Sequence, residues 1–113
     1  NIILKKNLFS IESIYKFLSK FKDNVHLYKG FSNSELLKID LSAIDMIFLD
    51  GGHSYETVSS DLSIILKEIK KGKVIICDDY DQEHYGVKKA VDELKYQVSE
   101  IKELNKRLVR ITA

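Results

Sequence analysis

The chain has 113 residues, with 18 basic and 17 acidic side chains and a formal net charge of +1. This balance argues against a nucleic-acid or anionic-membrane surface driven by bulk charge, and 44% apolar residues exclude the disordered class. We expect one domain spanning residues 1–113. The single cysteine, Cys77, excludes an internal disulfide and suits a reducing compartment, so we expect a cytoplasmic protein. The apolar runs are too short to cross a bilayer.

The first predicted elements are a strand, a helix and a second strand. Ile2–Leu4 is strand-like and follows Asn1 without an initiating methionine or a cap, so we expect the domain to be incomplete at its amino terminus. Apolar residues recur at helical spacing over residues 10–24, which predicts an amphipathic helix. Residues 25–28 then predict a strand that ends at Gly30.

Two continuous apolar runs, Met46–Leu49 and Val74–Cys77, predict strands that are buried on both faces of a parallel sheet. Between them, helical periodicity over 58–69 completes a strand–helix–strand unit of the usual size. A further helix is predicted over 87–94, whereas interleaved polar residues over 99–111 favour an antiparallel edge pair. The alternation predicts an α/β fold with a Rossmann-like, doubly wound, mostly parallel sheet, helices on both faces and an antiparallel edge strand.

Acidic residues follow both buried strands directly. Asp50 comes after the first strand, and Asp78 and Asp79 come after the next. Since the reactive crevice of an open α/β sheet lies beyond the carboxyl ends of its strands, we expect these three carboxylates to converge at one edge. Converging like charges favour a hard divalent cation such as Mg²⁺ or Ca²⁺. The alternative is that Asp50 starts a turn, a later aspartate caps a loop, and no ion binds.

His53 lies three residues after Asp50, in the loop before the next helix, where an imidazole can accept a proton near neutral pH. The alternative is a loop histidine that bonds to backbone. The other polar and aromatic candidates are interpreted mainly as structural, packing or solvated side chains: His26, His84, Tyr55, Tyr80 and Cys77.

Three segments together resemble the second half of class I S-adenosylmethionine-dependent methyltransferases, in the branch of small-molecule, sugar-type O-methyltransferases. They are Ile44–Glu56 (with Asp61 further along the helix), Val74–Tyr80 and Gly86–Asp92. The pattern Asp-Gly-x-His-x-Tyr followed by Asp-Asp-Tyr is fairly specific, and the resemblance covers the chain from about residue 25 onward.

The resemblance implies S-adenosylmethionine (SAM) as cofactor and Mg²⁺ held by Asp50, Asp78 and Asp79. It implies that Asp50 and His53 are catalytic, with His53 as the base that accepts the proton of a substrate hydroxyl. In the family, the loop after the third strand approaches the adenine ring of the cofactor. That loop corresponds here to Gly30, Phe31 and Ser32, and these residues and Asp50 are the expected cofactor contacts. The chemistry expected is displacement of an activated methyl group by an aligned hydroxyl oxygen.

The chain also departs from the family pattern. Its five glycines form no glycine-rich loop, Lys5 and Lys6 stand where a ribose-binding acid is expected, and the usual Pro-Gly-Gly turn is reduced to Lys71–Lys73. The first strand is therefore expected to be missing, which leaves a gap in the sheet. We expect the chain alone to bind the cofactor poorly or not at all and to self-associate through exposed sheet edges.

The leading interpretation is a metal-assisted O-methyltransferase domain that acts on a small hydroxylated molecule such as a sugar, with no nucleic-acid or membrane partner. The alternative is a noncatalytic α/β module that keeps the methyltransferase core and binds a partner. A phosphoacceptor receiver domain fits less well, because that fold expects its acid pair near the amino terminus, whereas Asp78 and Asp79 follow Asp50.

Overall fold

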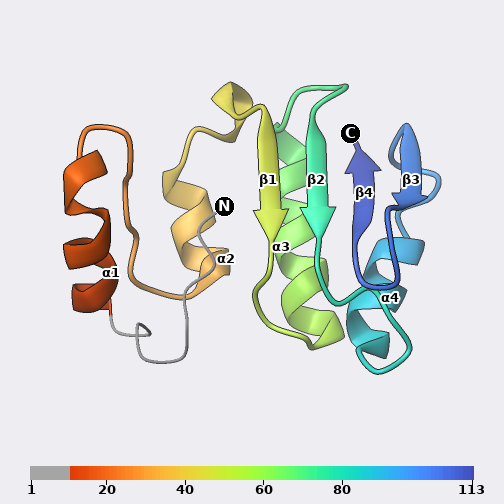
Figure 1. Ribbon diagram of the computed structural model, residues 1–113. Helices are drawn as coiled ribbons and strands as arrows, with labels where there is room; N and C mark the ends of the chain where they lie inside the picture. Colours follow the sequence, from red (N-terminus) through yellow and green to blue (C-terminus); the bar gives the residue numbers. More distant parts are fainter. Residues whose placement is uncertain (1–10) are drawn as a thin grey trace. The chain divides into compact units, whose positions relative to one another are not determined.

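The computed structural model describes residues 11–113, which fall into two compact units that divide after Gly30 (Figure 1). Each unit is described by itself. The first contains helix α1 (Ile11–Leu18) and a 3-10 turn (Ser19–Phe21), followed by a segment without regular structure. Single-domain organisation over residues 1–113 stays a prediction. No described helix is long and apolar enough to span a membrane.

In the first unit the predicted helix is confirmed, but the strand predicted over residues 25–28 is wrong. The side chains there still alternate between half-buried and exposed, as in a strand. A strand also needs a neighbour that shares its hydrogen-bond ladder, and the described part of this unit provides none. The strand predicted at Ile2–Leu4 lies outside the described residues.

The second unit holds a four-stranded sheet in the order β1-β2-β4-β3. The pair β1·β2 is parallel, whereas β2·β4 and β4·β3 are antiparallel. Its strands and helices are α2 (Ser32–Glu35), β1 (Met46–Leu49), α3 (Tyr55–Glu68), β2 (Val74–Cys77), α4 (Tyr85–Asp92), β3 (Glu100–Glu103) and β4 (Val109–Thr112), with 3-10 turns at Leu36–Lys38 and Leu41–Ala43.

The α/β class is confirmed, and the sheet is mixed rather than mostly parallel. The predicted closing pair forms, but only β3 lies at the edge. Strand β4 is inserted between β2 and β3, and Val109 and Ile111 are completely buried there. The sequence pattern over residues 99–111 therefore predicted that β3 and β4 pair with each other. It did not predict that β4, rather than β3, lies next to β2.

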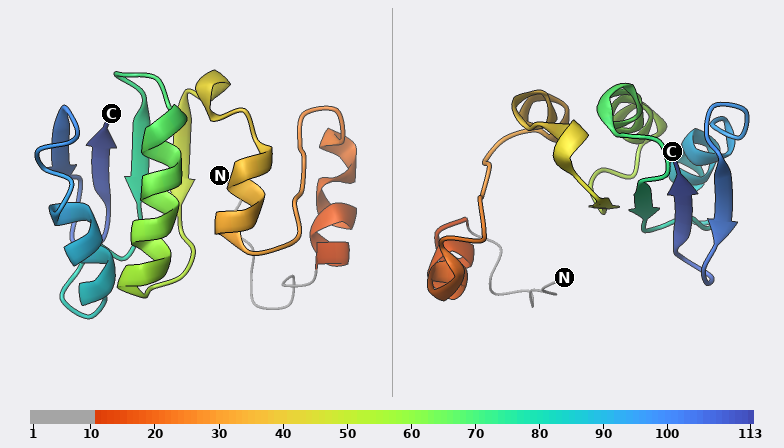
Figure 2. Two further views of the ribbon diagram at one scale, coloured as in Figure 1. Left: turned by 180° about the vertical axis from the view of Figure 1, so that it is seen from behind. Right: turned by 90° about the horizontal axis from the view of Figure 1, so that it is seen from above.

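Helices α3 and α4 cover the same face of the sheet, as the view from above in Figure 2 shows. The side chains of alternate strand residues, among them Ile75 and Ile111, are buried in the core beneath these helices. The opposite face carries Met46 and Phe48, which are exposed. Helices on both faces were predicted, and within this unit only one face has them, because both crossovers that follow β1 and β2 return over the same side.

Candidate active site at the strand ends

Strands β1 and β2 end level with each other, because Leu49 pairs with Cys77 in the parallel register. The backbone N–H of Asp78 donates to the carbonyl of Leu49 at 3.1 Å, which extends this ladder by one residue. The acids that follow are thus brought together as predicted. One carboxylate oxygen from each of Asp50, Asp78 and Asp79 lies within 4.8 Å of the others, and burial increases from Asp50 to Asp79.

Asp79 owes its orientation to a tight reversal of the backbone at the end of β2. Its φ of 59° is left-handed, a conformation that aspartate tolerates better than most residues because its short side chain bonds locally. The N–H of Asp79 donates to Oδ1 of Asp78 at 2.8 Å, and the N–H of Asp81 donates to the carbonyl of Asp79 at 2.9 Å. This turn directs the buried carboxylate of Asp79 toward His53, in the loop before α3, and toward His84, at the start of α4.

Arg107 supplies the positive charge next to the acid pair. Its Nη2 donates to Oδ1 of Asp79 at 2.8 Å and to Oδ2 of Asp78 at 3.1 Å, and this pairing raises the pKa of Arg107. The β3–β4 turn holds the arginine in place: Asn105 Oδ1 accepts from the N–H of Arg107, and the carbonyl of Arg107 accepts from the N–H of Tyr80. Sequence reasoning missed this residue.

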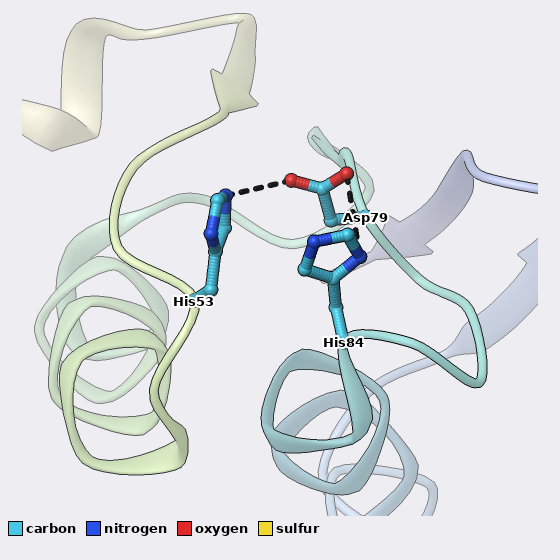
Figure 3. A group of neighbouring side chains, drawn as sticks. All are labelled: His53, Asp79 and His84. Carbon is cyan, nitrogen blue, oxygen red and sulfur yellow. Dashed lines mark ion pairs between the residues drawn. The ribbon is translucent and has the colours of Figure 1, made fainter.

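His53 contacts the other oxygen of Asp79. Its Nε2 lies 2.8 Å from Asp79 Oδ2, although the side chain is 56% exposed (Figure 3). The loop that carries it ends at Ser54, which caps α3 by accepting from the N–H of Thr57. Gly86 in α4 supports this loop closely, because a Cβ there would lie 2.8 Å from the carbonyl oxygen of His53. The structure therefore brings His53 into contact with one of the predicted acids, and its catalytic role stays a prediction.

His84 approaches Asp79 from the start of α4. Its Nδ1 lies 3.7 Å from Asp79 Oδ1 and donates to Asp81 Oδ1 at 2.9 Å. The hydrogen bond to Asp81 raises the pKa of His84, against the opposing effect of burial. The sequence indicated a structural or solvated role for His84 and did not place it beside His53. The centroids of the two imidazole rings are 4.7 Å apart. The spacing Asp-x-x-His at a helix start was the available signal.

The three converging carboxylates fit a hard cation in their chemistry, since oxygen ligands are what Mg²⁺ prefers. Their oxygens are close enough for one ion to reach. Both oxygens of Asp79 already have partners, however: Arg107 on Oδ1 and His53 on Oδ2. An ion shared by Asp50, Asp78 and Asp79 would therefore compete with the guanidinium of Arg107.

A second group of predicted residues lines a hollow of about 430 Å³ on one side of α3. Phe31, at the start of α2, is 83% exposed there. The hydroxyl of Ser32 donates to Oδ2 of Asp61 at 2.7 Å, while the other oxygen of this buried carboxylate has no hydrogen-bond partner among the described residues. Gly30 belongs to the first unit. A buried acceptor without a protein partner is normally satisfied by an ordered water or by a ligand.

The remaining candidates have structural positions. Cys77 is buried in the core, which raises the pKa of its thiol to about 12. Tyr80 is buried, and Tyr55 donates its hydroxyl to Glu93 at 2.6 Å. His26 is exposed in the first unit. A hollow of about 460 Å³ between α3 and α4 contains none of the predicted site residues.

A family model described as a methyltransferase domain matches residues 5–80, which is more than half of the chain. The chain belongs to this methyltransferase family. It is also 34% identical over 76 residues to an uncharacterized protein, R132, from Acanthamoeba polyphaga mimivirus. That match covers 61% of this chain and 34% of the relative, so the chain spans about a third of the curated relative's length.

Solved methyltransferase structures share the fold. A presumed rRNA methylase from Clostridium thermocellum superposes with a TM-score of 0.72 at 18% identity, over 97% of this chain and 69% of that one. CalS11, a TDP-rhamnose 3'-O-methyltransferase of calicheamicin biosynthesis, gives 0.64 at 19% identity, over 89% and 48%. A presumed methyltransferase from Streptococcus mutans, in complex with SAH, gives 0.63 at 17% identity, over 91% and 71%. The Rossmann-like α/β fold is thus confirmed for the methyltransferase domain.

Proposed function

We propose that this domain belongs to a SAM-dependent O-methyltransferase that acts on a hydroxyl group of a small molecule such as a sugar. Membership of the methyltransferase family supports the reaction class, and the fold it shares with CalS11 supports, by analogy, the acceptor class. The observation that carries the proposal is the convergence of His53 and the acids Asp50, Asp78 and Asp79 at the carboxyl ends of β1 and β2.

In this proposal His53 is the general base. Its Nε2 faces Asp79, so the hydroxyl proton is accepted at Nδ1 while Asp79 holds the ring and stabilises the resulting imidazolium. Arg107 holds Asp79 in position by donating to Oδ1. Asp50, the most exposed of the acids, is placed to accept a hydrogen bond from the acceptor alcohol. These residues orient the alcohol and remove its proton, and SAM, when bound, supplies the activated methyl group.

The hollow at α2 and α3 fits the nucleoside end of such a cofactor. Phe31 offers an exposed ring for stacking, and Asp61, which lies in the lining of the hollow, has one buried carboxylate oxygen without a hydrogen-bond partner. Ser32 fixes the other oxygen of Asp61 and so the direction of the free one. Mg²⁺ belongs to the same proposal: Asp50, Asp78 and Asp79 would hold it, and its charge would polarise the alcohol oxygen.

One observation favours the alternative of a noncatalytic partner-binding module. Arg107 already pairs with both Asp78 and Asp79, so each of these two carboxylates has a partner without an ion or a substrate. The two functions differ in whether the hollow at Asp61 binds a nucleoside.

The test is calorimetric titration of the full-length protein with SAH. We expect Asp61→Asn and Phe31→Ala each to weaken SAH binding at least about tenfold, the equivalent of one lost hydrogen bond or stacking contact. Tyr96→Ala removes an equally exposed aromatic side chain elsewhere, 88% exposed, and is the matched control. Absence of SAH binding in the wild type would favour the partner-binding module.

A further inference from the structure

The residues around Asp79 form a second possible donor set, which contains nitrogen. Ligand atoms of His53, Asp79 and His84 all lie within 4.8 Å of one another. The three side chains come from three different segments: the loop before α3, the end of β2 and the start of α4. Figure 3 shows both imidazoles beside the Asp79 carboxylate, with the second ring nitrogen of His84 on the side that faces His53.

We propose that His53, Asp79 and His84 bind a borderline divalent transition metal ion, Zn²⁺ or one of its close relatives such as Co²⁺. Two imidazoles and one carboxylate are a donor set that these ions favour over Mg²⁺. The ion would bond to Nε2 of both histidines and to Oδ2 of Asp79, and it would leave further coordination positions for water or an acceptor oxygen. This site does not rest on the proposed methyl transfer.

The residues behind the ligands support this assignment. Asp81 accepts from Nδ1 of His84 at 2.9 Å, which fixes the ring and leaves Nε2 as the ligand atom. Arg107 binds only Oδ1 of Asp79, so the ion and the guanidinium share one carboxylate without conflict. An ion on the three acids would instead compete with Arg107. An ion on the three acids would therefore displace Arg107, whereas an ion on His53, Asp79 and His84 would leave Arg107 in place.

The geometry requires little movement. Tetrahedral Zn²⁺ with bonds of about 2.0 Å places its ligand atoms roughly 3.3 Å apart. His53 Nε2 and Asp79 Oδ2 are already 2.8 Å apart, and one ligand atom of His84 lies within 4.8 Å of one ligand atom of each of the other two residues. The side chain of His53 is 56% exposed and that of His84 29% exposed, so both can turn without disturbing the core. The nearby acids, Asp78 and Asp81 in addition to Asp79, outnumber the guanidinium of Arg107 that pairs with them and favour a positive ion.

The test is titration of the untagged chain with Co²⁺, followed by the visible absorption of the bound ion. We expect one equivalent to bind with the band of a four- or five-coordinate site, and one equivalent of Zn²⁺ to displace it. His53→Gln and His84→Gln should each weaken Co²⁺ binding at least about tenfold, and Asp81→Asn about tenfold through the orientation of His84. His26→Gln removes the third histidine of the chain and should leave binding unchanged.

Asp50→Asn separates this site from the three-carboxylate set, because it removes a ligand of that set alone. We expect unchanged Co²⁺ binding in Asp50→Asn, and no displacement of Co²⁺ by a large excess of Mg²⁺. Circular dichroism of each variant shows whether it has folded. Absence of a Co²⁺ band in the wild type, or wild-type affinity in folded His53→Gln and His84→Gln, would overturn the assignment. Loss of binding in His26→Gln would also overturn it.

Discussion

Nη2 of Arg107 lies 2.8 Å from Oδ1 of Asp79, although the two residues are 28 positions apart in the sequence. A cation from the β3–β4 turn is thereby joined to the acid pair at the end of β2. This ion pair determines which oxygens of the strand-end acids remain available to substrates and ions.

Replacing Arg107 by Gln removes the guanidinium that competes for the acid pair. We expect Mg²⁺ to bind at least about tenfold more tightly to Arg107→Gln than to the wild type, since a charge-assisted bond no longer has to be broken. Calorimetric titration with Mg²⁺ measures this. Arg110→Gln, in the same hairpin but paired with Glu100, is the control. Equal Mg²⁺ affinity in all three proteins would show that the guanidinium and the ion do not share a site.

Gly86 is a position where a single methyl group should disturb the site. A Cβ would lie 2.7 Å from the N of Tyr55 and 2.8 Å from the O of His53, both backbone atoms that cannot turn aside. The helix propensity of alanine gains only about 1 kcal/mol. We therefore expect Gly86→Ala to lower the free energy of unfolding by about 1–3 kcal/mol. In urea denaturation Gly51→Ala, with nothing within 4 Å of its Cβ, should match the wild type.

Asp61 should show opposite effects on stability and on ligand binding. Its buried carboxylate has one unpaired oxygen, and a neutral amide costs less to bury than an ion. We expect Asp61→Asn to raise the free energy of unfolding by about 1 kcal/mol while it weakens SAH binding. Thermal unfolding without ligand measures the first effect. Destabilisation with SAH affinity unchanged would assign Asp61 a purely structural role.

Burial of Cys77 predicts a loss of stability at alkaline pH. Its pKa rises from 9.0 in the unfolded chain to about 12 in the fold, so the folded state retains a proton that the unfolded state releases. The stabilisation is complete below pH 9 and is lost as the pH rises toward 12. Between about pH 8 and pH 10 the free energy of unfolding should fall by about 1.4 kcal/mol more than in Cys77→Ala. Parallel urea titrations of the two proteins at both pH values test this, and equal slopes would contradict it.

The sequence predicted best those helices and strands that a local apolar run or a periodic hydrophobic pattern indicates. The apolar runs that became β1 and β2 determined where Asp50 and Asp78 emerge, because parallel strands end at one edge. Arg107 could not be found in this way, since its contact depends on the insertion of β4 beside β2. His84 was missed because its polar neighbours resemble a solvated loop. The segment 25–28 has strand-like alternation, but pairing depends on a neighbour that the local pattern cannot supply.

The central claim is that the residues gathered at the ends of β1 and β2 remove the proton of an alcohol during methyl transfer. The most direct measurement uses the full-length protein and follows the labelled methyl group of SAM into small hydroxylated acceptors. We predict that His53→Gln lowers kcat about a hundredfold or more and leaves SAM binding unchanged. Wild-type turnover in His53→Gln, or a wild-type protein that binds SAM but methylates no hydroxyl group, would contradict the account.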